Sequence, residues 1–133
     1  MDISKYTAFF HDGSLIQIEH KNNKIELSMS SAEIDSADLE EPIELSGNDC
    51  IVGRLHIEGI TSIKIGNKLL TEPLKMEYDD GGIVNFKIIG NTVRLAIQWD
   101  NYPPKPAIDE FSVITIEGQK IYWENIPNLE SGF

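Results

Sequence analysis

Three histidines and one cysteine are the side chains in this sequence with the widest range of chemistry. His11, His20 and His56 lie in the first half of the chain, and no histidine follows His56. A zinc site needs several ligands that converge, and Cys50 and His56 lie six residues apart with no second cluster to join them. We therefore expect no metal site and no cofactor.

Nucleophilic catalysis also lacks a sequence signature. His11 and Asp12 could form a dyad, but Asp12 precedes Gly13 and is better suited to stabilising a turn. No serine lies in a Gly-x-Ser-x-Gly motif, and Cys50 begins an apolar stretch, as expected for a packed thiol rather than an activated one. The sequence thus predicts no catalytic residue and favours a protein that is not an enzyme.

A second group of polar residues alternates with apolar ones in one predicted strand. Arg54, His56 and Glu58 all face the side opposite to Leu55 and Ile57. We expect them to form a solvent-facing polar row, in which exposed ion pairs contribute little to stability.

The carboxylates are concentrated in one interval of the sequence. The 133 residues include 22 acidic and 11 basic side chains, for a net charge of −11, and no Lys or Arg lies between Lys24 and Arg54. Eight of the acidic residues fall in that interval, most of them in residues 33–44, which we call the acidic segment. Complementary charge speeds encounter between proteins, so we predict that the acidic segment binds a basic protein partner. The candidate binding residues are Glu33, Asp35, Asp38, Glu40, Glu41 and Glu44.

Ile34 and Leu39 would supply apolar anchors for the partner among the carboxylates. The alternative is a solvated loop whose charge only keeps the protein soluble.

Aromatic side chains offer a different class of function. Trp99, Tyr102 and Tyr122 could form a small-molecule or carbohydrate site on a β-sandwich, with Tyr102 beside a proline-rich loop. Trp99 follows the parity of Leu95 and Ile97, which instead predicts a place in or at the edge of the core. Such a site requires the three rings to be exposed together.

The acid excess excludes several partners. A nucleic-acid-binding protein needs Lys and Arg to displace counterions from phosphates, and an anionic membrane surface repels an acidic chain. No apolar run approaches the roughly 20 residues that span a bilayer, and the N-terminus lacks the pattern of a secretory signal. We therefore expect a cytoplasmic protein that binds neither nucleic acid nor membrane. The sequence does not indicate an oligomeric state.

The elements that must position these residues are mostly short strands. The length suits a single domain over residues 1–133. Period-two alternation between turn residues predicts an all-β fold, an antiparallel sandwich or partly open barrel of about nine short strands with a short N-terminal helix. Besides a hairpin over 15–31, we expect an edge strand at 42–46, strands at 50–58, 62–65, 74–78, 84–88 and 93–99, and a last hairpin of 111–117 and 120–125. Asp79 to Gly82 predicts a turn, as does Gly118-Gln119.

The stretch Phe9-Phe10-His11-Asp12-Gly13-Ser14-Leu15-Ile16-Gln17-Ile18, in which Phe-His-Asp and a small residue lead into the first strand, resembles a pattern in small, poorly characterised bacterial all-β proteins. Some of these are immunity-type proteins of toxin systems, acidic partners that neutralise a toxin by binding it. The resemblance implies a non-catalytic interaction protein and a structural role for His11-Asp12, and it supplies no active-site residues.

Overall fold

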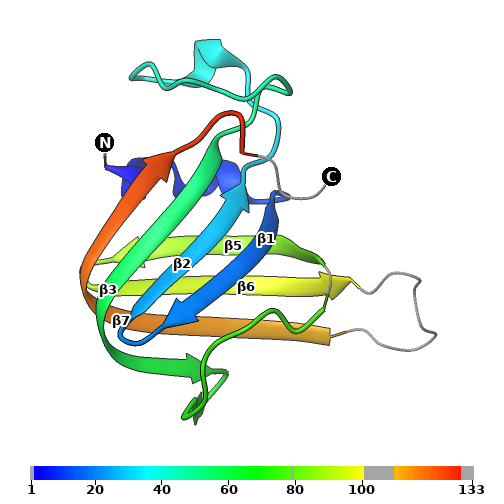
Figure 1. Ribbon diagram of the computed structural model, residues 1–133. Helices are drawn as coiled ribbons and strands as arrows, with labels where there is room; N and C mark the ends of the chain where they lie inside the picture. Colours follow the sequence, from blue (N-terminus) through cyan, green and yellow to red (C-terminus); the bar gives the residue numbers. More distant parts are fainter. Residues whose placement is uncertain (1, 79, 101–109, 130–133) are drawn as a thin grey trace.

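The computed structural model describes residues 2–78, 80–100 and 110–129 and confirms an all-β antiparallel fold (Figure 1). The strands in these residues are β1 (Ser14–Lys21), β2 (Lys24–Ser30), β3 (Val52–Ile65), β4 (Lys68–Leu69), β5 (Asp80–Ile89), β6 (Thr92–Asp100) and β7 (Glu110–Asn125). The helical elements there are 3-10 turns: η1 (Ile3–Lys5), η2 (Thr7–Phe10) and η3 (Ser36–Asp38). None of them has the length or apolarity that crossing a membrane would require.

The strands form one sheet that curls back on itself. Their order is β2-β1-β5-β6-β7-β3-β4, and β2 also pairs with β3, so β1, β2 and β3 lie across β5, β6 and β7 (Figure 1). The ring is weakest between β1 and β5, where the strand register holds only Ser14 opposite Gly82 and Leu15 opposite Gly81. A partly open barrel, one of the two predicted architectures, describes this arrangement.

The core lies between the two layers and follows from the alternation in the sequence. On β6, Val93, Leu95 and Ile97 are fully buried and Trp99 is 4% exposed. The predicted hairpin over 15–31 is confirmed by β1 and β2, whose turn places Asn22 at φ +53°. Apolar burial of this kind stabilises the fold by about 25 cal/mol per Å².

The strand count is lower than predicted partly because two glycines do not end strands. β3 continues through Gly59, which has φ +66°, and β7 continues through Gly118. A Cβ atom at Gly118 would lie 2.6 Å from the Ile57 side chain, so this glycine serves close packing between paired strands rather than a turn. The last hairpin is therefore wrong, and the described residues hold seven strands instead of about nine.

The turn expected at 79–82 is also wrong over residues 80–82. Residue 79 lies outside the described residues. Asp80, Gly81 and Gly82 begin β5 and pair with β6. A Cβ atom at Gly81 would lie 2.7 Å from the Ile97 side chain, which explains the need for glycine. The predicted strands at 42–46 and 74–78 are irregular, although Leu74 is 3% exposed and packs in the core.

The N-terminus forms η1 and η2 in place of the predicted helix. The apolar spacing was a correct sign of burial, because Ile3, Tyr6 and Phe10 are buried, but two turns are too short for a stable α-helix. The ring of Phe10 meets those of Phe86 and Trp123 edge-on, at centroid distances of 5.2 and 5.7 Å. The N-terminal turns thus pack against β5 and β7.

Candidate functional site

The acidic segment lies between β2 and β3 and stands off one end of the barrel (Figure 1). All six predicted binding residues are exposed: Glu33, Asp35, Asp38, Glu40, Glu41 and Glu44. Among the described residues, none of the ion pairs involves any of them. Their charge is therefore not neutralised by a close base within the described part of the chain.

The base of the acidic segment is fixed by the fold. Ile34 is 5% exposed in the core, and its N–H donates to the Asp49 carbonyl at 2.8 Å. The Ala32 N–H donates to the Phe9 carbonyl at 3.0 Å, and the Asp35 carboxylate accepts from the Ala37 N–H at 3.0 Å at the start of η3. The segment thus presents its carboxylates from a held backbone.

The expectation that Ile34 and Leu39 anchor a partner is wrong. Ile34 belongs to the core, and Leu39 is partly buried against it. Apolar residues in an irregular segment pack inward because they have a core within reach, so the exposed side of the segment is polar.

The second half of the acidic segment faces the N-terminal turns. A hollow of about 440 Å³ separates the two, and Lys5 is the one base among the residues that line it: Lys5, Tyr6, Phe9, Asp38, Glu40 and Glu41. The Tyr6 hydroxyl donates to the Glu41 carbonyl at 3.4 Å. This hollow is open to a side chain from outside.

A second polar surface covers the outer face of β2, β3 and β7. The strand registers place Glu26, His56 and Tyr122 side by side, with Lys24, Glu58 and Lys120 in the next row. We call this surface the polar wall: Lys24, Glu26, Arg54, His56, Glu58, Lys120, Tyr122 and Glu124.

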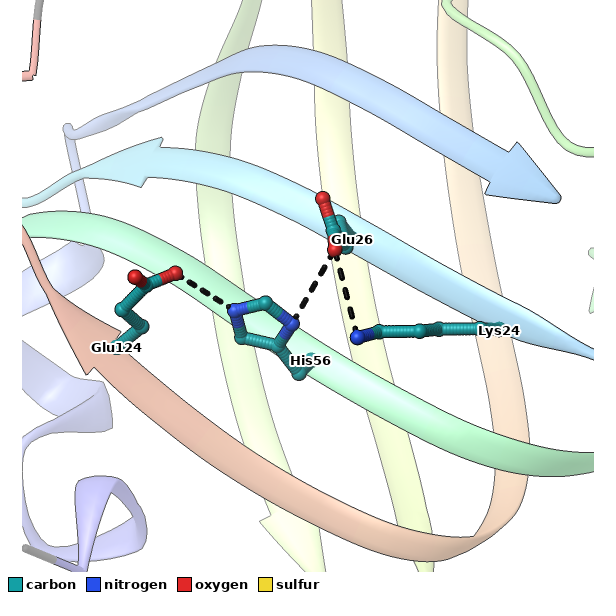
Figure 2. A network of polar contacts seen from close by, with 4 residues as sticks. All are labelled: Lys24, Glu26, His56 and Glu124. Carbon is teal, nitrogen blue, oxygen red and sulfur yellow. Dashed lines mark hydrogen bonds and ion pairs between the residues drawn. The ribbon is translucent and has the colours of Figure 1, made fainter.

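His56 lies at the centre of the polar wall. The sequence predicted that this side chain faces solvent, but it is only 7% exposed, so that prediction is wrong for His56. Its Nε2 lies 2.9 Å from Glu124 Oε1, and its ring stacks on Tyr122 at a centroid distance of 4.6 Å and an angle of 2°. Its Nδ1 lies 3.5 Å from Glu26 Oε1 but has no hydrogen-bond partner (Figure 2). Neighbouring side chains cover the imidazole, although it points away from the core.

A hydrogen-bonded pair joins the two rows of the polar wall. The Tyr122 hydroxyl donates to the Glu58 carboxylate, and this bond, assisted by the charge of Lys24, holds the pKa of Glu58 below its ordinary value. The same hydrogen bond, followed by desolvation, raises the pKa of Tyr122. The Lys120 ammonium lies 5.0 Å from the centre of the Tyr122 ring.

We expect Tyr122 to ionise above the ordinary tyrosine pKa of about 10. Because the folded-state pKa of Tyr122 is raised and that of Glu58 is lowered, the bond between them stabilises the fold fully between the ordinary pKa of Glu58 and that of Tyr122. Its contribution is lost as the pH rises through the folded value of Tyr122 and as it falls through the folded value of Glu58. The difference in tyrosinate absorbance between wild type and Tyr122→Phe, followed against pH, measures this step. Glu58→Gln should move the step to lower pH, and a step at or below the ordinary value would contradict the assignment.

The remaining histidines and the cysteine do not converge. His11 Nδ1 lies 2.6 Å from the Val84 carbonyl, His20 Nδ1 accepts from the Leu74 N–H at 2.8 Å, and Cys50 is half-buried. Over residues 2–78, 80–100 and 110–129, no three His, Cys, Asp or Glu side chains are grouped so as to hold a metal ion.

The aromatic residues of the alternative ligand site are not brought together where they are described. Trp99 is buried and donates from Nε1 to the Ser112 hydroxyl at 2.9 Å, as its parity predicted. Tyr122 lies on the outer face, twelve residues along β7 from Glu110, the register partner of Trp99. Twelve residues correspond to roughly 40 Å measured along a strand. Tyr102 lies outside the described residues.

Sequence reasoning identified His56 but missed Glu26 and Glu124 as its neighbours. The three residues come from three strands, and only the strand register brings them together. Comparisons of the chain with protein-family models, curated proteins and solved structures found no match. The geometry of the acidic segment and the polar wall is therefore the basis for assigning a function.

Proposed function

We propose that this chain is a non-catalytic interaction protein that binds a basic protein partner through the acidic segment. The observation that supports it most is the set of six exposed carboxylates, none of them in an ion pair within the described residues. Such a surface attracts a basic partner over about a Debye length and orients it on approach.

The fixed base of the segment adds to this argument. A segment held by the core burial of Ile34 and by backbone hydrogen bonds at Ala32 and Ile34 loses little conformational entropy on binding. Pre-organised contacts of this kind retain more of their interaction energy as affinity. Binding is then electrostatic, with polar contacts in place of apolar anchors.

The resemblance of residues 9–18 to immunity-type proteins suggests what the partner is. In that proposal the partner is a basic toxin, and the chain neutralises it by occupying a basic surface. No catalytic group of this chain is needed, because occlusion alone prevents the toxin from reaching its target.

Capture of partners from a lysate of the cells that make the protein tests the proposal. The variant Asp38→Asn/Glu40→Gln/Glu41→Gln removes three carboxylates and leaves Asp35, which caps η3, in place. At about 150 mM salt, we expect wild type to capture a basic protein and the variant to capture at least about tenfold less. The purified partner should then rebind wild type with an affinity that falls as salt rises.

The matched control is Glu72→Gln/Glu77→Gln/Glu117→Gln, which removes the same charge from exposed positions outside the acidic segment. This control should capture the partner as wild type does. Equal capture by all three proteins would overturn the proposal, and an equal loss in both variants would reduce it to a non-specific effect of net charge.

A further inference from the structure

The layer formed by β5, β6 and β7 has an outer face that points away from the core, and the second half of β3 and the short strand β4 extend it. Leu95 and Ile114 are buried, so the residues that alternate with them on these strands face outward. The strand registers place four outward side chains in one row across this face: Lys87, Arg94, Thr115 and Lys64. We call the three bases of this row, Lys64, Lys87 and Arg94, the basic row.

The charge of this face is opposite to that of the chain. All three bases of the basic row are exposed, and none of the ion pairs between described residues involves them. Among the outward neighbours two residues away on each strand, one carries a carboxylate, Glu117, whose Oε2 accepts from the Ser62 hydroxyl at 3.4 Å. Three bases thus face one acid here, whereas the whole chain carries a net charge of −11.

Exposed apolar side chains on the same strands are an independent sign of an interaction surface. Leu69 is 61% exposed and lies opposite Lys64, so it continues the row onto β4. Ile89 is 72% exposed and lies two residues from Lys87 on β5, at the other end of the row. The large apolar residues that the described chain exposes all belong to β4, β5 or β7: Leu69, Val84, Ile89 and Phe111. Exposed apolar groups beside charged ones are typical of a surface that another molecule covers.

The occupant of this face needs carboxylates and apolar groups together. Nucleic acid and anionic membranes present negative charge over an area wider than the basic row, so they also meet the net charge of −11, which repels them. A second copy of the chain offers its acidic segment, but Ile34 and Leu39 of that segment pack inward and leave Leu69 and Ile89 without a contact. A different protein with acidic and apolar residues close together in its sequence supplies both groups.

We infer that the basic row binds an extended acidic segment of another protein, with carboxylates on the three bases and an apolar side chain on Leu69. Complementary charge attracts such a segment and fixes its position along the row. The surface lies on other strands than those that flank the acidic segment of this chain, and the inference does not rest on the proposed function.

The spacing of the row matches that of an extended peptide. Lys87, Arg94, Lys64 and Leu69 lie on β5, β6, β3 and β4, and β7 lies between β6 and β3. Neighbouring strands are about 4.8 Å apart, so the three later positions lie about 5, 14 and 19 Å from Lys87. Alternate side chains of an extended peptide repeat about every 6.8 Å. Three alternate carboxylates followed by one apolar side chain therefore reach the four residues in order.

Titration of the whole chain with a designed heptapeptide, followed by backbone amide NMR shifts, tests the inference. The peptide has glutamate at positions one, three and five, leucine at position seven and threonine between them. We expect saturable shifts at residues 62–69, 85–89, 92–96 and 113–117, with a dissociation constant on the order of millimolar for so short a ligand. Binding should weaken as salt rises. The counterpart with glutamine in place of glutamate should give no saturable shift.

The variant Lys64→Gln/Lys87→Gln/Arg94→Gln should bind the peptide at least about tenfold more weakly, and its three positions are exposed, so the fold is not at risk. The matched control is Lys5→Gln/Lys21→Gln/Lys75→Gln, which removes the same charge from exposed positions elsewhere. This control should bind as wild type does.

No saturable shift, or equal binding of the glutamine counterpart or by the basic-row variant, would overturn the inference. Shifts of the basic row and of residues 33–44 that grow with the concentration of the protein alone would assign this face to a second copy and would also overturn it. Neither result bears on the capture of a basic partner by the acidic segment, so the two proposals fail separately.

Discussion

Replacing Phe10 with alanine is expected to lower the free energy of unfolding by about 3–5 kcal/mol. Phe10 is fully buried and packs edge-on against Phe86 and Trp123, so the change leaves a cavity where the N-terminal turns meet the barrel. The neighbouring Phe9 carbonyl accepts the bond that holds Ala32. Chemical denaturation measures the loss, and hydrogen exchange should show faster opening at Ala32 and Ile34.

Phe111→Ala is the matched control for this prediction. Phe111 is 54% exposed on β7, so its truncation should change the unfolding free energy by less than about 0.5 kcal/mol. Similar effects of the two substitutions would contradict the assignment of the N-terminal turns to the core.

Replacing Gly53 with alanine is expected to cost about 3 kcal/mol, at the upper end for an added methyl group in a packed site. A Cβ atom at Gly53 would lie 2.1 Å from the Glu124 carbonyl oxygen and 2.8 Å from the Trp123 side chain. Gly53 is opposite Met29 on β2 and Asn125 on β7, so relief of the clash must separate strands that close the barrel. Chemical denaturation measures the loss, and we expect a lower midpoint for Gly53→Ala than for wild type.

Gly47→Ala tests whether the effect is specific to strand packing. A Cβ atom at Gly47 would meet nothing within 4 Å, so the change should be neutral within about 0.5 kcal/mol. An unchanged midpoint for Gly53→Ala would show that β3 and β7 do not approach as closely as described.

The fold class could be predicted because it depends on local alternation. Val93, Leu95 and Ile97 follow each other at a spacing of two, and all three are fully buried. The turn at Asn22 likewise follows from the polar residues between two alternating runs. These features need no knowledge of which strands become neighbours.

The strand boundaries could not be predicted where glycine serves a distant neighbour. Gly118 accommodates Ile57 of β3, and Gly81 accommodates Ile97 of β6. In the sequence these residues look the same as a turn glycine, because the close approach that requires them exists only after the strands pair.

The candidate site, like the fold, could be predicted from the sequence only in part. The exposure of the acidic segment followed from its composition, but the inward packing of Ile34 depends on a core assembled from other elements. The contacts of His56 with Glu26 and Glu124 join β2, β3 and β7, and no spacing within one strand encodes them.

Carboxylate labelling in the presence and absence of the captured partner tests the central claim most directly. In the free protein, the six exposed carboxylates of the acidic segment should all react with a carbodiimide and an amine, as read by mass spectrometry. In the complex, we predict that labelling falls at least about threefold at Asp38, Glu40 and Glu41, while Glu72 and Glu117 react as before. Full reactivity of the acidic segment in the complex would contradict the claim that it binds the partner.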